Sequence, residues 1–357
     1  MRAESLDFLR TLCNTPSPSG YEERAAQVYR DYTGQFADEI RTDRHGNVMA
    51  VLNPQASQKI MLAGHMDEIG FQVHYIDDKG FLYFRGIGGH DTMVPVGNRV
   101  LVHGSEAVPG VIGRKPIHLL ENGEKDKRPD LADMVIDIGA TSREDAESVV
   151  SIGDCVTYQY GFAELRNGRA VARGFDNRVG TFAVAEALRH AKESGSLDPG
   201  VGIYAVATVQ EEIGLRGART AAQGLGAQSG IAVDVDFAID HPGLSQTKYG
   251  ACDIGKGPSI TRGANINPVV FRMLKDAAEK EGIPFQIAAE PGGTGTDANA
   301  MQVAGAGMAT GLVGIPLRYM HTPCELLDLA DAENCARLMA AYCLGVKADT
   351  DFTPRIF

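Results

Sequence analysis

Two neighbouring glutamates, Glu211 and Glu212, follow an apolar run that has the character of a buried strand. This run, residues 201–209, lacks the polar alternation of a half-exposed strand, so it fits a strand covered on both faces in an α/β sheet. Reacting groups in such sheets collect just outside the carboxyl ends of the strands. The pair could therefore bind a metal ion or transfer a proton, although pairs of acidic residues are also common on protein surfaces.

A histidine and an aspartate follow an earlier apolar segment, residues 59–63, in the sequence Gly64-His65-Met66-Asp67. In extended backbone, residues two apart face the same way, so Asp67 can reach the imidazole of His65. A histidine that binds a metal ion commonly donates its free N–H to a carboxylate. The pattern His-x-Asp therefore indicates a metal ligand with its supporting acid.

Three more polar residues follow segments that we interpret as strands: Asp176 after residues 169–172, Asp234 after 230–233 and His321 after 309–315. Together with His65 and the glutamate pair, we expect them along one rim of one sheet. An aspartate between a strand and a helix is most often an N-cap, so Asp176 keeps this structural alternative. The other histidines, such as His90, lie on no comparable strand end of the α/β part, with His241 the nearest exception, and are expected to be structural or solvated.

The combination of residue types favours particular metals. Two histidines with several carboxylates and no thiolate suit zinc, cobalt or manganese better than calcium. Three ligand carboxylates and a bound hydroxide would balance the charges of two dications. Adjacent ions lower the pKa of a bridging water and polarise a carbonyl, and a carboxylate that is not a ligand can carry the proton to the leaving group. The side chains of neighbouring residues in an extended chain project in opposite directions. We therefore expect one of Glu211 and Glu212 to be a metal ligand and the other to be the base.

Composition limits the class of protein. The chain has 357 residues, enough to bury a large core, and a net charge of −12, which argues against a nucleic-acid or anionic membrane partner. Its six cysteines include no CxxC pair, so we expect free thiols in a reducing compartment, the cytoplasm. The N-terminus lacks the apolar core of a signal peptide, and no apolar run approaches the ~20 residues of a membrane span.

The pattern of apolar residues divides the chain into two parts. Residues 1–70 and 166–357 alternate apolar runs with helical periodicity, which predicts one discontinuous α/β domain. Residues 71–165 contain short strand-like pieces at close spacing, which predicts an inserted β-rich domain, either a small barrel or a sandwich. Near the start, Ser19 and Glu22 resemble a capping box for a helix of about four turns.

Five motifs occur in the order known from one peptidase family. The stretches AGHMDEIG (63–70), FDNR (175–178), VQEEIGLRGA (209–218), VDV (233–235) and RYMHTP (318–323) resemble those of the M42 metallo-aminopeptidases, which include glutamyl aminopeptidases and the tetrahedral TET peptidases. The resemblance covers essentially the whole chain. It implies a zinc-exopeptidase-like α/β/α sandwich with a central mixed sheet and an inserted, barrel-like dimerisation domain at residues 71–165.

The resemblance also implies the roles of individual residues. Asp176 would bridge two metal ions, one of them held also by His65 and Asp234, the other by Glu212 and His321. Both ions would be divalent, with zinc or cobalt favoured and manganese as a further candidate.

Two supporting roles and a backbone feature follow from the same resemblance. Glu211 would be the general base, and Asp67 would orient His65. The peptide bond between Asp176 and Asn177 is expected to be cis. The inserted domain would mediate dimer contacts, and six dimers could assemble into a hollow tetrahedral dodecamer.

The function that follows is a metal-dependent aminopeptidase. It would remove N-terminal residues from short peptides by means of a water bridged between the two metal ions. One alternative is a deacylase of N-acyl amino acids, because the same metal pair could cleave either amide. An endoglucanase is disfavoured, since glycoside hydrolysis by paired carboxylates needs neither metal nor histidine ligands. A non-catalytic assembly subunit is a fourth hypothesis, against which stands the presence of all proposed ligands and the base.

Overall fold

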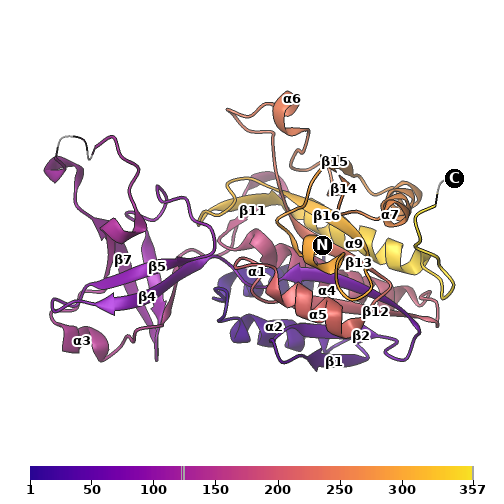
Figure 1. Ribbon diagram of the computed structural model, residues 1–357, viewed down its shortest axis with the longest axis horizontal. Coiled ribbons are helices and arrows are strands. Elements are labelled where there is room, and N and C mark those ends of the chain that lie inside the picture. The colour runs from indigo at the N-terminus through magenta and orange to yellow at the C-terminus, as the bar shows by residue number, and fades with distance from the viewer. Residues whose placement is uncertain (122, 124, 356–357) are drawn as a thin grey trace.

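The computed structural model describes residues 1–121, 123 and 125–355. Figure 1 shows an α/β part, which contains both ends of the described chain, and a separate β-rich part on the left. The strand that leads into the β-rich part begins at Gly70, and the last strand of that part ends at Tyr158.

An eight-stranded mixed sheet forms the centre of the α/β part. Four neighbouring strands in its middle, β12, β3, β13 and β16, run parallel. Strand β2 is antiparallel to both of its neighbours, whereas β14 is antiparallel to β16 and parallel to β15. In spatial order the strands are β1 (Glu39–Thr42), β2 (Val48–Leu52), β12 (Val201–Thr208), β3 (Gln58–His65), β13 (Ser229–Phe237), β16 (Ala309–Leu317), β14 (Ser259–Gly263) and β15 (Gln286–Glu290).

Helices cover both faces of this sheet, as expected for a layered α/β fold. In β3, Ile60 and Leu62 pack into one apolar core, and Met61 and Ala63 pack into the core on the other face. The first core is shared with α1 (Ala3–Asn14), α2 (Glu23–Thr33), α4 (Phe175–Ser194), α7 (Pro268–Glu281) and α9 (Leu329–Gly345). The second is shared with α5 (Arg216–Leu225) and α8 (Asp297–Met301). None of the helices in the described ranges has the length and apolar character to span a membrane.

The β-rich part is a closed six-stranded barrel. Its strands follow the order β4 (Gly70–Ile76), β5 (Leu82–Ile87), β8 (Met134–Asp137), β7 (Ala107–Arg114), β6 (Arg99–His103) and β9 (Cys155–Tyr158). Pairing of β9 with β4 closes the barrel, so it has no exposed edge strand. A separate apolar core fills the interior, and α3 (Arg143–Glu147) packs on the outside near β4. Of the two architectures that the sequence left open, the barrel is the one found.

A small third sheet corrects one expectation from the sequence. Strand β11 (Arg169–Ala172) pairs with β10 (Ala163–Glu164) and β17 (Glu325–Asp328), and not with the central sheet. The prediction that Asp176 follows a strand of the same sheet as the other candidates was therefore wrong. The residue instead reaches the central sheet through α4, which begins at Phe175 and packs against β3 and β13. The short helix α6 (Gln246–Tyr249) lies on a protruding loop (Figure 1).

Candidate metal centre

The carboxyl ends of the parallel strands bring most of the candidate residues to one edge. His65 is the last residue of β3 and lies in register with Thr208, the last residue of β12. Glu211 and Glu212 follow Thr208 in the next turn, and Asp234 lies inside β13, the neighbour of β3 on its other side. His321 follows the end of β16, which pairs with β13. The strand-end rule therefore places these side chains at the same edge of the sheet.

Asp176 arrives at this edge from the first turn of α4. The helix can approach β3 closely because position 64 is a glycine: a Cβ there would lie only 2.4 Å from the carbonyl carbon of Gly180. The peptide bond from Asp176 to Asn177 is cis, as expected, and both residues have non-helical backbone angles. The N-cap position is Gly174, so Asp176 does not serve as the N-cap.

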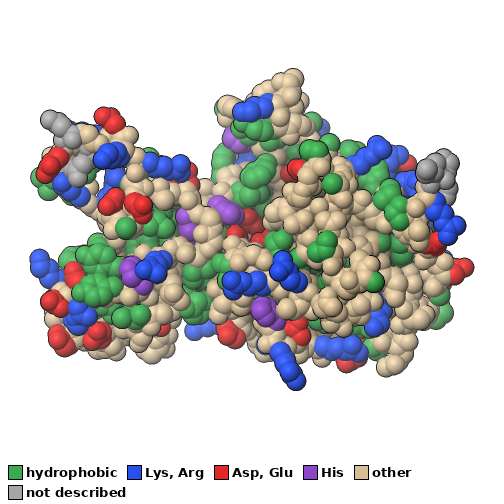
Figure 2. All heavy atoms as spheres, viewed as in Figure 1, with side chains coloured by type: hydrophobic (Ala, Val, Ile, Leu, Met, Phe, Trp, Pro, Cys, Tyr) green, Lys and Arg blue, Asp and Glu red, His purple; other side chains and the backbone are tan. Residues whose placement is uncertain are grey.

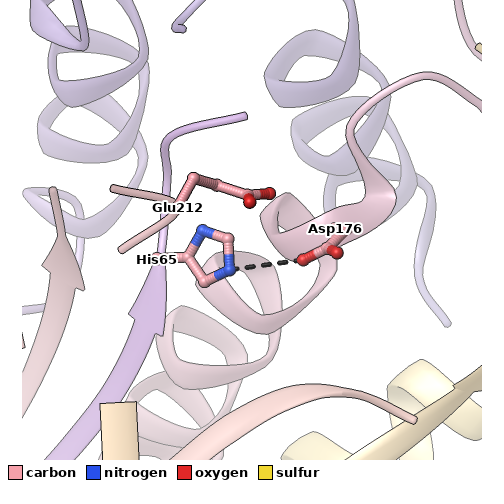
Figure 3. Close-up of side chains that lie close together, drawn as sticks. All are labelled: His65, Asp176 and Glu212. Carbon is pink, nitrogen blue, oxygen red and sulfur yellow. Dashed lines mark ion pairs between the residues drawn. The ribbon is translucent and has the colours of Figure 1, made fainter. Parts of the chain in front are cut away.

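Asp176 lies between two imidazoles and turns a different oxygen to each. Its Oδ1 is 3.3 Å from Nε2 of His65, and its Oδ2 is 3.2 Å from Nε2 of His321. Each imidazole also faces a second carboxylate: Oδ1 of Asp234 is 3.8 Å from His65, and Oε1 of Glu212 is 3.5 Å from His321. Figure 3 shows His65, Asp176 and Glu212 pointing toward a common space. The Asp176 carboxylate therefore lies between two groups of possible ligand atoms, one around His65 and one around His321.

The carboxylate of Asp67 supports the backbone of the glutamates more directly than it supports His65. Its Oδ1 accepts the amide of Glu211 at 3.0 Å, and its Oδ2 accepts the amide of Glu212 at 3.2 Å and the hydroxyl of Ser19 at 2.6 Å. Nδ1 of His65 lies 3.1 Å from the main-chain oxygen of Asp67 and 3.5 Å from its carboxylate. Residue 67 thus contacts His65 mainly through its carbonyl.

Two further acceptors complete this support for the turn that carries the glutamates. Oδ1 of Asn47 accepts the amide of Val209, and Oε1 of Glu22 accepts the amide of Gln210, both at 3.1 Å. Together with Asp67, they satisfy four consecutive amides, 209–212. Gln210 has a φ of 54°, in the left-handed region, so the fixed hydrogen bonds are needed to hold the turn. No sequence pattern indicated this role for Asn47, and the spacing of Ser19 and Glu22 suggested a capping box instead.

That capping box does not form. Helix α2 begins at Glu23 and its N-cap residue, Glu22, makes no side-chain cap hydrogen bond. Ser19 donates to Asp67, and Glu22 accepts from Gly20 and Gln210. Both side chains therefore serve the candidate centre, and local spacing could not reveal this because their partners are distant in sequence.

Removal of the Glu22 carboxylate tests the support. We expect Glu22→Ala to lower the free energy of unfolding by about 1–3 kcal/mol, because the partly buried amide of Gln210 loses its acceptor. Glu22→Gln keeps one carbonyl oxygen as an acceptor, so its free energy of unfolding should fall by less. Denaturant unfolding measures both, with Glu23→Ala, an exposed neighbour, as the control. Equal stability of Glu22→Ala and the control would contradict the assignment.

Burial and the charges of neighbouring carboxylates raise the pKa of several carboxyl groups in the candidate centre. Burial raises the pKa of Glu211 to about 10, and the charges of Asp234 and Asp297 add to the shift, against the effect of His65. The pKa values of Glu212 and Asp234 also lie well above the usual range, mainly because of burial. These shifts mean that the described chain supplies too little positive charge to ionise every carboxyl group in the cluster.

Asp176 is the exception. Although burial alone would raise the pKa of Asp176, hydrogen bonding to the imidazoles of His321 and His65 lowers it. Nearby carboxylates and the Asp176 hydrogen bond outweigh burial at His65 and raise the pKa of its imidazole. Positive charge beside Asp176 thus lowers the pKa of its carboxyl group, and a bound cation would act in the same direction.

The donor atoms fit a divalent cation. Oε1 of Glu211 and Oε1 of Glu212 are buried and have no hydrogen-bond partner among the described residues. Buried carboxylate oxygens without a donor are rare in native proteins unless an ion or a water satisfies them. Imidazole nitrogens together with carboxylate oxygens suit zinc, cobalt or manganese.

Two more buried acids belong to this region, and sequence reasoning missed both. Glu325 accepts the amide of Asp176 at 3.0 Å and that of His321 at 2.9 Å, so one carboxylate ties the two segments together. Asp297, at the start of α8, is 2% exposed and accepts the hydroxyl of Thr208 at 2.6 Å. Its proximity to the cluster depends on how α8 packs on the sheet, which no sequence motif indicated.

A third acid, Glu68, is adjacent to the candidate residues in sequence but has a structural role. Its carboxylate pairs with the fully buried Arg178 at 2.6 Å and with Arg173 at 3.1 Å. A second group of possible ligands, Glu186, His190 and Glu333, lies elsewhere. The Arg189 guanidinium contacts Glu186 at 2.7 Å and already compensates its charge there.

The comparisons with known proteins agree with the resemblance. A family model described as M42 glutamyl aminopeptidase matches residues 46–338. The chain belongs to the M42 family. It is similar to the lysyl aminopeptidase of Pyrococcus furiosus, with 36% identity over 353 residues that cover 98% of this chain and 99% of the relative.

Solved structures of TET peptidases share the whole architecture. The TET aminopeptidase of the marine sediment archaeon Thaumarchaeota archaeon SCGC AB-539-E09 superimposes with a TM-score of 0.91 at 35% identity and covers 96% of this chain and 97% of its own. The TET1 peptidase of Pyrococcus horikoshii gives a TM-score of 0.84 at 30% identity, with 96% and 100% covered. The mixed sheet with its barrel is therefore the M42 fold. Together with the named relatives, the family match makes this M42 chain an aminopeptidase with a divalent metal cofactor.

Proposed function

We propose that this aminopeptidase removes N-terminal residues from short peptides with the help of two divalent cations, zinc, cobalt or manganese. The observation that carries the proposal is the position of Asp176, whose two oxygens face the imidazoles of His65 and His321 at 3.3 and 3.2 Å. One cation would be held by His65, Asp234 and Oδ1 of Asp176. The other would be held by His321, Glu212 and Oδ2 of Asp176.

Two cations bound in these places would lower the pKa of a shared water and polarise the carbonyl of the scissile bond. Glu211 is the residue that we assign as general base. Its carboxylate lies 3.6 Å from Nε2 of His65, and its Oε1 has no hydrogen-bond donor among the described residues. A carboxylate held beside the attacking water can take its proton and deliver it to the amine that leaves.

The support around the glutamates fits this division of roles. Because Asp67 holds the main-chain amides of both Glu211 and Glu212, the two side chains leave the backbone in fixed directions. Glu212 is directed to His321, and Glu211 is directed to His65. One is thereby available as a ligand and the other as a base.

We further propose that residues 1–70 and 166–357 form the catalytic domain and that residues 71–165 mediate dimer contacts. Met93, Ile117 and Leu119 in the inserted part are exposed by 61%, 60% and 66%, which suits a surface that a second copy covers. The TET1 peptidase of Pyrococcus horikoshii is described as assembling into a tetrahedron or a large octahedral shell. A tetrahedral dodecamer of this chain is part of the proposal, as is a cytoplasmic location, which suits its free cysteines.

Removal and return of the metal tests the cofactor. We expect chelation to reduce hydrolysis of aminoacyl-p-nitroanilides to background, because the water would lose the cations that lower its pKa and the carbonyl would lose its polarisation. About two equivalents of zinc, cobalt or manganese per chain should restore it. Full activity after chelation would contradict the proposal, and chelator-insensitive cleavage of a β-glucan would support the endoglucanase alternative.

The state of the substrate's N-terminus separates the aminopeptidase from the deacylase. Figure 2 shows acidic and histidine side chains gathered where the barrel meets the α/β part, at the base of a hollow. A free peptide amine carries a positive charge that suits such surroundings. We expect a dipeptide with a free amine to be cleaved and its N-acetylated twin to be left intact, as measured by chromatography. Preference for the acetylated twin would favour the deacylase.

A further inference from the structure

A loop of the barrel lies against the proposed second cation site, that of His321 and Glu212. It consists of residues 88–90, directly after β5. The main-chain oxygen of Gly89 is 2.8 Å from Nδ1 of His321 and accepts its hydrogen. A histidine that donates from Nδ1 presents a free Nε2 lone pair, and Nε2 is the atom that faces Asp176 and Glu212.

The same loop packs on the second ligand of that site. Gly88 has a φ of +79°, and a Cβ at this position would lie 2.7 Å from Cγ2 of Ile69 and 3.3 Å from Oε2 of Glu212. Only a glycine fits here without displacing its neighbours. The loop is therefore in close contact with both Glu212 and His321, which come from distant parts of the chain.

His90 fixes the loop in this position. Its Nε2 lies 2.8 Å from the carbonyl oxygen of Gly70 and 3.1 Å from that of Ile87, so one N–H spans the first pair of the β4–β5 hairpin. The ring also stacks on Phe71, with centroids 4.5 Å apart and planes 20° apart. Phe71 is fully buried in the barrel core. His90 thus ties the loop to the core of the barrel.

We propose that His90 is a positioning residue: by holding the Gly89 carbonyl, it lets the barrel orient His321 and so sets the affinity of the second cation site. The inference rests on the proposed two-cation function. The role of His90 goes beyond that function, because the affinity of the second site would then depend on the barrel as well as on the α/β part. The His65–Asp234 site takes its imidazole support from Asp67, inside the α/β part, and should not depend on His90.

Three variants separate this role from simple support of the barrel. His90→Met removes the N–H and keeps an apolar side chain of similar length. His90→Gln restores an amide N–H at about the position of Nε2. His103→Met is the matched control, because His103 is also a half-buried barrel histidine with one side-chain hydrogen bond, 2.8 Å to Thr157, away from the loop.

Calorimetric titration of the metal-free chains with zinc provides the test. We expect two binding phases in the wild type, and we identify the first site by the phase that persists in His321→Ala. In His90→Met, the affinity of the second site, that of His321 and Glu212, should fall by about 10–100-fold, as for other residues that orient metal ligands. The affinity of the first site should change little. His90→Gln should recover most of the loss, and His103→Met should match the wild type.

Unchanged affinities in His90→Met would overturn the inference, as would equal weakening of both phases. An equal loss of zinc affinity in His103→Met would also overturn it, because the effect of His90→Met would then be explained by lower stability of the barrel. A wild type that binds a single zinc ion would instead refute the two-cation proposal itself, and this inference with it.

Discussion

Glu211→Gln is expected to lower kcat by roughly 10²–10⁴-fold, the range that general acid–base catalysis contributes, while two cations still bind. The amide has nearly the shape of the carboxylate but cannot take a proton from water. The main-chain amide of residue 211 keeps its hydrogen bond to Asp67, so the turn should keep its shape. Steady-state kinetics with an aminoacyl-p-nitroanilide measures kcat, and calorimetry measures the metal content.

Glu212→Gln provides the comparison for this variant. Its side chain faces His321 at 3.5 Å, so its loss should weaken cation binding as well as turnover. Neighbouring substitutions of the same type would then give different results. If Glu211→Gln retained wild-type kcat, the assignment of the base would be wrong; if it lost a cation, Glu211 would be a ligand.

Asp176→Asn should release both cations. The two carboxylate oxygens of Asp176 face the imidazoles of His65 and His321, so each oxygen would contribute to one of the two cation sites. The amide retains one oxygen but loses the negative charge and offers a donor in place of the second oxygen. We expect affinity at both sites to fall by more than the 10–100-fold typical of residues that only support a ligand, and hydrolysis to fall to background. Elemental analysis after dialysis gives the metal content per chain.

Asp236→Asn is the matched control. Asp236 also lies in β13, two residues after Asp234, but its carboxylate accepts the hydroxyl of Ser259 at 2.7 Å. It should keep both cations. Retention of one tightly bound cation in Asp176→Asn would show that Asp176 does not bridge.

Residues at the ends of parallel strands were within reach of sequence reasoning. An unbroken apolar run such as β12 has few interpretations, and the rule that reacting groups collect at the carboxyl ends then applies. His65, Asp234 and the glutamate pair were found in this way. Asp176 was found by the same rule, although its preceding strand lies in another sheet. The strand rule does not hold there, and Asp176 lies at the same edge because α4 returns it to the central sheet.

Residues whose role depends on a distant main-chain group were out of reach. Glu325, Glu22 and Asn47 act by accepting amides of segments far away in the sequence, and His90 acts on carbonyls of two barrel strands. Spacing along the chain carries no information about such partners. It even suggested a local use for Glu22, in a helix cap, which tertiary contacts override.

The barrel illustrates the same limit at the level of the fold. Short strands at close spacing are common to barrels and sandwiches, so the sequence left the choice between them open. Closure depends on the antiparallel pairing of β4 with β9, where Phe71 lies opposite Val156. This pairing joins strands from the two ends of the inserted segment. The loop between β5 and β6 contacts His321 at the candidate centre, and these two segments are far apart in the sequence.

Anomalous diffraction from crystals loaded with zinc tests the central claim most directly. We expect two peaks per chain, one beside Nε2 of His65 and one beside Nε2 of His321, with the carboxylate of Asp176 between them. A single peak at this centre would contradict the account. So would peaks confined to the group of Glu186, His190 and Glu333.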